Sequence, residues 1–181
     1  MLTVAGTGLS VSGGAVLALL VVHADQVVGL THGDPRIGLL FTAGAVGALC
    51  AALLLPRVSR RWGAGRSIAA YGGFVPALVA LALSGNLLPA LGTWLIWQAT
   101  YTMAITNGIT IRQQLTPDAM QGRVNTTGRM IAMGGAPFGA LLGGLLADQI
   151  GVQATYLLAC APVFAATVAI WASSVPRLRL S

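Results

Sequence analysis

The sequence contains no lysine and no glutamate, and only four aspartates, so charged residues make up 8% of its 181 residues. A soluble domain carries about 25% charged residues, and a chain with so few cannot cover a water-exposed surface. Apolar residues take their place: 56% of the chain is hydrophobic, and the mean hydropathy is +0.81. The composition therefore excludes an ordinary soluble domain and indicates a membrane protein.

Cysteine and histidine are also scarce, which leaves little material for a metal site or a catalytic centre. Cys50 and Cys160 both lie inside apolar runs, without the polar surroundings of zinc ligands or disulfide frameworks. We expect both to be buried packing residues. His23 and His32 lie at the edges of apolar runs, and neither a phosphate-binding loop nor a serine-protease motif is present. The sequence therefore predicts no enzyme, no catalytic residue, no metal and no cofactor.

The net charge of +6 would suggest a nucleic-acid partner if the protein were soluble. Every basic residue apart from histidine is an arginine, however, and most of the arginines lie in short segments between apolar runs. That distribution is a topology signal of membrane proteins. We therefore expect the lipid bilayer, and not nucleic acid, as a partner.

Six apolar runs are long enough to cross a bilayer as helices, which needs roughly 20 residues each. They cover about residues Val4–Val28, Ile37–Val58, Ser67–Gly85, Leu91–Ile111, Val124–Ala147 and Val152–Val175. The predicted fold class is an all-α membrane protein, with six transmembrane helices in one bundle over residues 1–181.

The arginines predict the orientation of this bundle. Eight of the ten fall in segments on one side, which are Arg57, Arg60, Arg61 and Arg66, then Arg112 and Arg123, then Arg177 and Arg179. Because arginine is enriched in cytoplasmic loops, this side and both termini are predicted to be cytoplasmic. The other side has Arg36 alone, beside three aspartates. Trp94 and Tyr156 are expected there as aromatic anchors at the outer interface.

An ordered series of short motifs runs through the last third of the chain. It consists of Arg112-Gln113, Pro117-Asp118, Gly122-Arg123-Val124, Pro137-Phe138-Gly139-Ala140, Gly143-Gly144 and Ala147. This series resembles the loop and eleventh helix of major facilitator superfamily transporters, in the bacterial efflux branch that includes the enterobactin exporters. The basic loop Arg57–Arg66 is similar to the loop after helix eight of that family. It differs by Arg60 where the family has aspartate and by Ala64 where a basic residue is usual.

The resemblance covers nearly the whole chain and matches helices seven to twelve of a twelve-helix transporter. It implies efflux of a small amphipathic molecule by alternating access, driven by proton antiport, in a bacterial inner membrane. The expected partner is an N-terminal half of six helices or a second copy of this chain. A non-transporting membrane scaffold or an inactive transporter fragment is the alternative.

Small residues in the predicted fifth span favour close contact with another helix. Gly135, Gly139 and Gly143 repeat every four residues on one face, where helices without side chains approach closely. The same face would suit a sliding surface during a rocking motion. Pro137 removes one helix hydrogen bond and predicts a kink. A similar stripe in the second span consists of Gly44, Ala48 and Ala52.

Polar side chains inside the predicted fourth span are costly in hydrocarbon unless they are hydrogen-bonded or face water. Gln98, Tyr101, Thr102 and Thr106 share one face at helical spacing, and Asn107 lies on another. The wall of a substrate cavity and hydrogen bonding between helices both fit this pattern.

Three ionisable residues near or within the spans are candidates for transport chemistry. Arg129 lies about two turns inside the fifth span, where it either contacts substrate or a gate, or extends its long side chain to the interface. His23 and Asp25, at the outer end of the first span, are either proton-coupling groups or a solvated loop end. No carboxylate lies in the middle of a span, so a coupling acid is expected in the other half.

Overall fold

The computed structural model describes residues 2–31, 33–62, 71–114, 116–117 and 120–171, and every regular element in these ranges is helical. The seven helices are α1 (Leu2–Ala18), α2 (Leu20–Gln26), α3 (Ile37–Trp62), α5 (Tyr71–Ala82), α6 (Leu87–Gln114), α7 (Gln121–Ile150) and α8 (Val152–Trp171). The predicted all-helical class is confirmed. Helices suit these apolar runs because each one satisfies its own backbone hydrogen bonds without water.

Two described helices are long and apolar enough to cross a membrane, namely α3 over Ile37–Val58 and α7. A third candidate arises if α1 and α2 form one bent span. The six predicted spans go beyond these two or three candidates, and parts of the third and sixth lie outside the described residues. Helix α6 begins at Leu87 and not at the predicted Leu91, since Pro89 falls in the first turn, where its missing N–H is not needed.

The predicted first span, Val4–Val28, is two helices that meet at Leu19 with a bend of 44°. The bend coincides with a hydrogen bond from another helix, in which the hydroxyl of Tyr156 donates to the carbonyl of Val16 at 3.1 Å. In a straight helix that carbonyl accepts from the N–H of Leu20. A side chain that competes for a helix carbonyl is one of the recognised causes of a kink.

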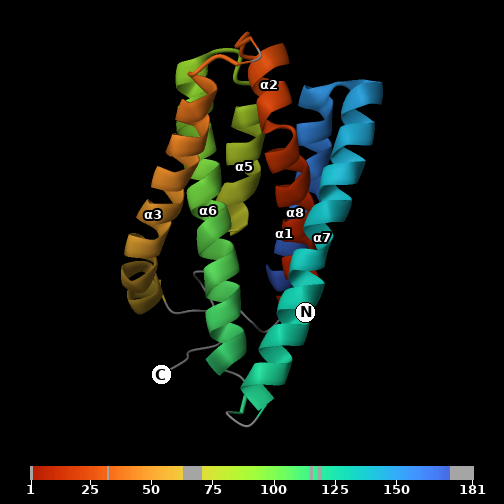
Figure 1. Cartoon of the computed structure of the whole chain (residues 1–181). Helices are drawn as coiled ribbons and strands as arrows, with labels where there is room; N and C mark the ends of the chain where they lie inside the picture. Colours follow the sequence, from red (N-terminus) through yellow and green to blue (C-terminus); the bar gives the residue numbers. More distant parts are fainter. Residues whose placement is uncertain (1, 32, 63–70, 115, 118–119, 172–181) are drawn as a thin grey trace.

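The helices pack as two groups joined at the centre (Figure 1). Helix α3 packs against α6, while α1 packs most extensively against α7 and also against α8. Helix α5 joins the groups because it contacts both α6 and α8. Helices α6 and α7 converge at the end where α6 stops and α7 begins, and they diverge toward the other end (Figure 1). Gly151, with a φ of 84°, makes the tight turn from α7 into α8.

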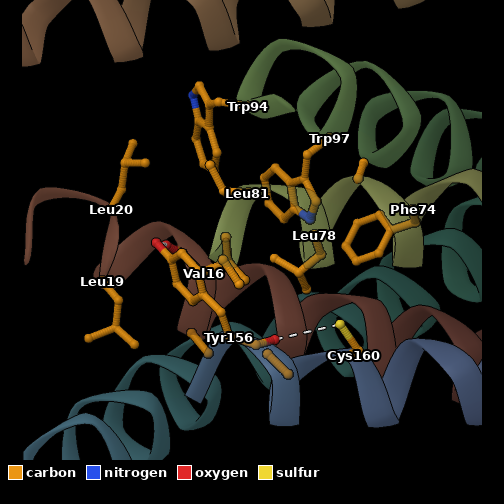
Figure 2. Packing of buried hydrophobic residues seen from close by; sticks show 14 of the residues in the cluster. Val16, Leu19, Leu20, Phe74, Leu78, Leu81, Trp94, Trp97, Tyr156 and Cys160 are labelled. Atoms are coloured by element: carbon orange, nitrogen blue, oxygen red, sulfur yellow. Dashed lines mark hydrogen bonds between the residues drawn. The ribbon is translucent and has the colours of Figure 1, made fainter. Parts of the chain in front are cut away.

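The core between α5, α6 and α8 is built around aromatic rings. Trp94 and Trp97 stack with ring centroids 4.7 Å apart, and Trp97 stacks in turn on Tyr101 at 5.0 Å. Figure 2 shows the leucines of α5 between these tryptophans and Tyr156 of α8. Trp94 is 2% exposed and Tyr156 is fully buried, so the prediction that they anchor the outer interface is wrong. Their positions in the sequence suggested an interface, whereas their large apolar rings are used to fill the bundle.

The contact between α1 and α7 depends on glycine. A Cβ on Gly139 would collide with the backbone carbonyl of Val11, and one on Gly143 would lie 2.9 Å from the Cβ of Ala15. From the other side, a Cβ on Gly14 would collide with the backbone of Ala136. The two backbones therefore touch along this seam, where van der Waals contact replaces side-chain packing.

The contact between α3 and α6 shares Gly44 with the predicted stripe but continues through other small residues. Gly47 lies against the carbonyl of Leu95, and Gly44 leaves room for the indole of Trp94. Ala51 is also buried, whereas Ala52 is exposed. The stripe therefore runs through positions 44, 47 and 51, whose steps of three and four keep them on one helix face.

The two cysteines have different environments. Cys160 is buried, as predicted, and its Sγ contacts the carbonyl of Tyr156 at 3.6 Å (Figure 2). Cys50 is exposed on α3, so the prediction that it is buried is wrong. Its neighbours Leu49, Leu53 and Leu54 are exposed as well, which marks a wide apolar face turned away from the described helices.

Candidate functional site

A cavity of about 310 Å³ lies between α1, α6 and α7, near the end where α6 and α7 converge. It has the size of pockets that hold small molecules. The first half of α1, the second half of α6 and the first half of α7 form its walls. The lining residues are Gly6, Leu9, Ser10, Tyr101, Ile105, Gly108, Ile109, Arg112, Arg129, Met133 and Ala136. The surface is thus mostly apolar, with two guanidinium groups, a phenol and a hydroxyl.

Arg112 enters the cavity wall from the last turn of α6 and crosses toward α7. A Cβ on Gly128 would lie 2.5 Å from its Nη1 and 3.1 Å from its Cζ, so the guanidinium rests on this glycine. Its Nε is buried and has no hydrogen-bond partner among the residues that the structure describes. A buried N–H of a charged group is costly without a hydrogen-bond acceptor. Arg112 can therefore donate a hydrogen bond to an acceptor on a bound molecule.

Arg129 follows Gly128 directly and also lines the cavity. Its side chain is exposed, and its Nε lies 3.4 Å from the sulfur of Met133 one turn along α7. A thioether is a weak acceptor, so this contact leaves most of the donor capacity of the guanidinium unused. The neighbouring Ser10 donates its hydroxyl to the carbonyl of Met133 at 3.4 Å.

Tyr101 connects the cavity to the aromatic core. Its ring lines the cavity, stacks on Trp97, and lies 5.9 Å from the ring of Phe74. A Cβ on Gly13 would lie 2.6 Å from its hydroxyl oxygen, so this glycine of α1 leaves the space that the phenol occupies. The position of the phenol is therefore determined by packing on two sides.

The other polar residues predicted along α6 do not line this cavity. Gln98 and Thr102 are half-buried, Thr106 is exposed, and Asn107 is 2% exposed. Tyr101 is the only member of the predicted α6 set in the described lining. Arg112 was predicted as a loop residue and not as a lining residue, although Tyr101, Ile105, Gly108 and Arg112 follow each other at helical spacing on one face.

The glycine seam holds the cavity walls together. Gly135, Gly139 and Gly143 are buried against α1, and a Cβ on Gly135 would lie 2.9 Å from the carbonyl of Thr7. Pro137 is exposed and lies inside α7, which continues as one helix from Gln121 to Ile150. Because Ser10 and Val11 are adjacent, the seam fixes the distance between the α1 and α7 walls.

The candidate proton-coupling residues lie at the opposite end from the cavity. His23 is 1% exposed, and its ring stacks on Tyr156 with centroids 5.0 Å apart. For His23 the interpretation as a solvated loop end is therefore wrong, since it packs inside the bundle. Asp25 is half-buried at the end of α2.

The described arginines of the predicted cytoplasmic segments lie at the end of the bundle where α6 stops and α7 begins. Arg57 is exposed, with its Nη1 3.3 Å from the carbonyl of Leu53, and Arg123 is exposed in the first turn of α7. Arg60 and Arg61 belong to the last turn of α3, and Arg66 lies outside the described residues. Among the described residues, no group of three histidine, cysteine or acidic side chains could hold a metal ion.

The sequence profile of one protein family matches residues 2–180, which is nearly the entire chain. Its description is transmembrane secretion effector, and it is a family of the major facilitator superfamily. No curated protein matches the chain.

Proposed function

We propose an export function for this chain, which belongs to the transmembrane secretion effector family of the major facilitator superfamily. Members of this family are membrane transporters and not enzymes, so the chain belongs to a transport system in a lipid bilayer. The finer proposal is efflux of a small amphipathic molecule by alternating access, coupled to protons. The chain would supply the C-terminal half of an exporter from the branch that includes the enterobactin exporters.

The observation that carries the proposal is the cavity between α1, α6 and α7. Apolar walls with a few polar groups are typical of small-molecule sites. The cavity lies in the half of the bundle that contains the described arginines Arg57, Arg112 and Arg123. By the positive-inside rule this is the half that faces the cytoplasm, which is the side from which an exporter takes its cargo.

The proposed topology has six spans, with both termini in the cytoplasm of a bacterial cell and the chain in the inner membrane. Helices α1 and α2 would form one bent span, and α3, α5, α6, α7 and α8 the other five. The described charges support this arrangement. Asp25, Asp34, Arg36 and Asp148 lie at one end of the bundle, and the three arginines named above lie at the other.

A second six-helix unit is the proposed partner, either an N-terminal half or a second copy of this chain. The substrate path between the two units would be faced by the polar residues Gln98, Tyr101, Thr102, Thr106 and Arg129. Asn107 of α6, which is buried, would lie inside the bundle. The coupling acid would come from the partner unit, because no carboxylate lies among the described lining residues. His23 is packed away from the cavity and would not exchange protons with it.

Reconstitution in liposomes tests the proposal. The chain alone, and the chain co-expressed with a six-helix partner, would be compared for movement of a panel of amphipathic dyes with and without a proton gradient. We expect gradient-dependent movement only with the partner, and less of it in an Arg129→Ala variant. Movement by the chain alone would favour a carrier made of two copies. No movement in either case, with correctly inserted protein, would favour the non-transporting scaffold.

A further inference from the structure

We propose that the cavity between α1, α6 and α7 selects amphipathic anions, whose carboxylate, sulfonate or phosphate group is held by Arg112 and Arg129. This inference rests on the proposed export function only where it identifies the bound anion as cargo. The binding preference itself follows from the charges, the packing and the volume of the cavity.

The charge balance of the lining is the first argument. Two arginines reach the same cavity, and none of the described lining residues is acidic. Asp25 and Asp148 lie at the far end of the bundle, and Asp34 is bound to Arg36 at 2.7 Å. Asp118 lies outside the described residues. Two guanidinium groups beside apolar walls favour the binding of an anion between them, because apolar surroundings screen charges poorly.

The position of Arg112 is the second argument. Its guanidinium lies across Gly128, next to the residue that carries the other guanidinium, and its Nε is buried without a described partner. A planar guanidinium with free donors matches the oxygens of carboxylate and phosphate groups. Gly128 is what allows this placement, since any larger residue there would occupy the space of the guanidinium.

The apolar lining and the volume are the third argument. Leu9, Ile105, Ile109 and Met133 line the cavity beside the arginines, together with the ring of Tyr101. About 310 Å³ accommodates one or two fused rings or a short alkyl chain. A ligand with a single anionic end and an apolar body satisfies both parts of the lining. A cationic amphipath of the same size would be repelled by the two guanidinium groups.

A pair of fluorescent probes that differ in one charged group tests this preference. The full chain in nanodiscs of phosphatidylcholine would be titrated with 1-anilinonaphthalene-8-sulfonate and with N-phenyl-1-naphthylamine, which lacks the sulfonate. We expect the Arg112→Gln and Arg129→Gln variants each to lose at least about tenfold in affinity for the anionic probe, because each removes a charged hydrogen bond. Their affinity for the neutral probe should stay within about twofold.

Three further variants serve as controls. Arg57→Gln and Arg123→Gln remove exposed arginines that do not line the cavity, and both should bind the two probes as the parent does. Gly128→Leu keeps both charges but displaces the guanidinium of Arg112, so it should lower the affinity for the anionic probe and leave that for the neutral probe unchanged. Asp118→Asn should not lower the affinity for the anionic probe. If this variant gained affinity, Asp118 would compete with the anion for an arginine, which is consistent with the proposed site.

Two results would overturn the inference. One is unchanged affinity for the anionic probe in an Arg112→Gln/Arg129→Gln double variant that still binds the neutral probe. The other is an equal loss for both probes, which would describe an apolar pocket without charge selection. Thermal unfolding of each variant reports on folding independently of the probes, so a variant that fails to fold is recognised. The test then rests on Gly128→Leu, which keeps both charges but displaces the guanidinium of Arg112.

Displacement of the bound sulfonate probe distinguishes two sources of the anion. Decanoate represents a small carboxylate taken from the cytoplasm, and cardiolipin represents a phospholipid headgroup. Displacement by decanoate alone assigns the cavity to a small cargo, and displacement by cardiolipin alone assigns it to a lipid. Displacement by neither would contradict an anion site. The dye-transport assay is independent of these titrations, so movement of neutral dyes by a chain without anion selectivity would leave the export function standing.

Discussion

The hydroxyl of Tyr156 on α8 donates a hydrogen bond of 3.1 Å to the carbonyl of Val16, just before α1 bends into α2. One residue thereby connects three helices, because its ring also stacks on His23 of α2. The pairing joins positions 140 residues apart in the chain. A bend that depends on such a distant partner cannot be predicted from the neighbouring residues in the sequence.

Tyr156→Phe tests the role of this hydrogen bond. The substitution keeps the ring and its stacking but removes the donor, which should cost about 1 kcal/mol of stability. We expect a lower thermal unfolding midpoint in nanodiscs and a smaller bend between α1 and α2. Leu157→Ala, on the neighbouring exposed residue, is the matched control and should change little. A midpoint equal to that of the parent would mean that this hydrogen bond does not stabilise the bundle, and an unchanged bend would mean that the bend has another cause.

The glycine seam gives the second prediction. Gly139→Ala should reduce the yield of folded protein, because its Cβ would collide with the carbonyl of Val11, and a backbone cannot move aside as a flexible side chain does. Gly144→Ala is the control on the same helix, since a Cβ there meets nothing within 4 Å. Alanine generally favours a helix over glycine by roughly 0.5–1 kcal/mol, so Gly144→Ala should be neutral or stabilising.

Size-exclusion profiles and thermal unfolding in detergent would compare the two variants. Equal yields would show that α1 and α7 are further apart than the structure has them. A harmful Gly144→Ala together with a harmless Gly139→Ala would place the seam on the other face of α7.

The orientation of the bundle gives the third prediction. In a background without Cys50 and Cys160, single cysteines would replace Gln114, at the end of α6, and Gln149, near the end of α7, both of which are exposed. An impermeant thiol reagent added to whole cells should label Gln149→Cys and spare Gln114→Cys, because the positive-inside rule places the arginine-rich end in the cytoplasm. The opposite pattern would invert the proposed topology, and labelling of both would argue against a fixed orientation.

Much of the fold could be predicted from patterns that depend only on neighbouring residues. The apolar runs predict helices, and the four-residue glycine repeat in α7 indicates a close-packing face. The same kind of reading failed for Trp94, Tyr156 and His23, which it placed at an interface or a loop end. Their burial depends on which helices surround them, and that information lies in distant parts of the chain.

The candidate site was predictable only in part for a related reason. Tyr101 and Arg129 were identified because a polar group in an apolar run is conspicuous. Arg112 was assigned to a cytoplasmic loop, since it follows the last apolar residue of its run. The structure extends α6 to Gln114, and this brings Arg112 onto the same helix face as Tyr101 and across Gly128. The extension of α6 by about one turn is therefore enough to place Arg112 in the cavity wall and not in a loop.

The aromatic row gives the last prediction, because it couples the core to the cavity. Trp97 is 1% exposed and lies between Trp94 and Tyr101, so it supports the ring that lines the cavity. Trp97→Leu should lower stability by on the order of 2 kcal/mol, less than in a soluble core because lipid is as apolar as the site that is lost. The neighbouring Ile96 is 53% exposed, so Ile96→Ala should leave stability unchanged.

In the Trp97→Leu protein the phenol of Tyr101, no longer held on one side, should also move, and N-phenyl-1-naphthylamine should bind several-fold more weakly. Thermal unfolding and the probe titration measure the two effects separately. A Trp97→Leu protein that is destabilised but binds the neutral probe as the parent does would show that Tyr101 is held by Gly13 and Phe74 without help from Trp97.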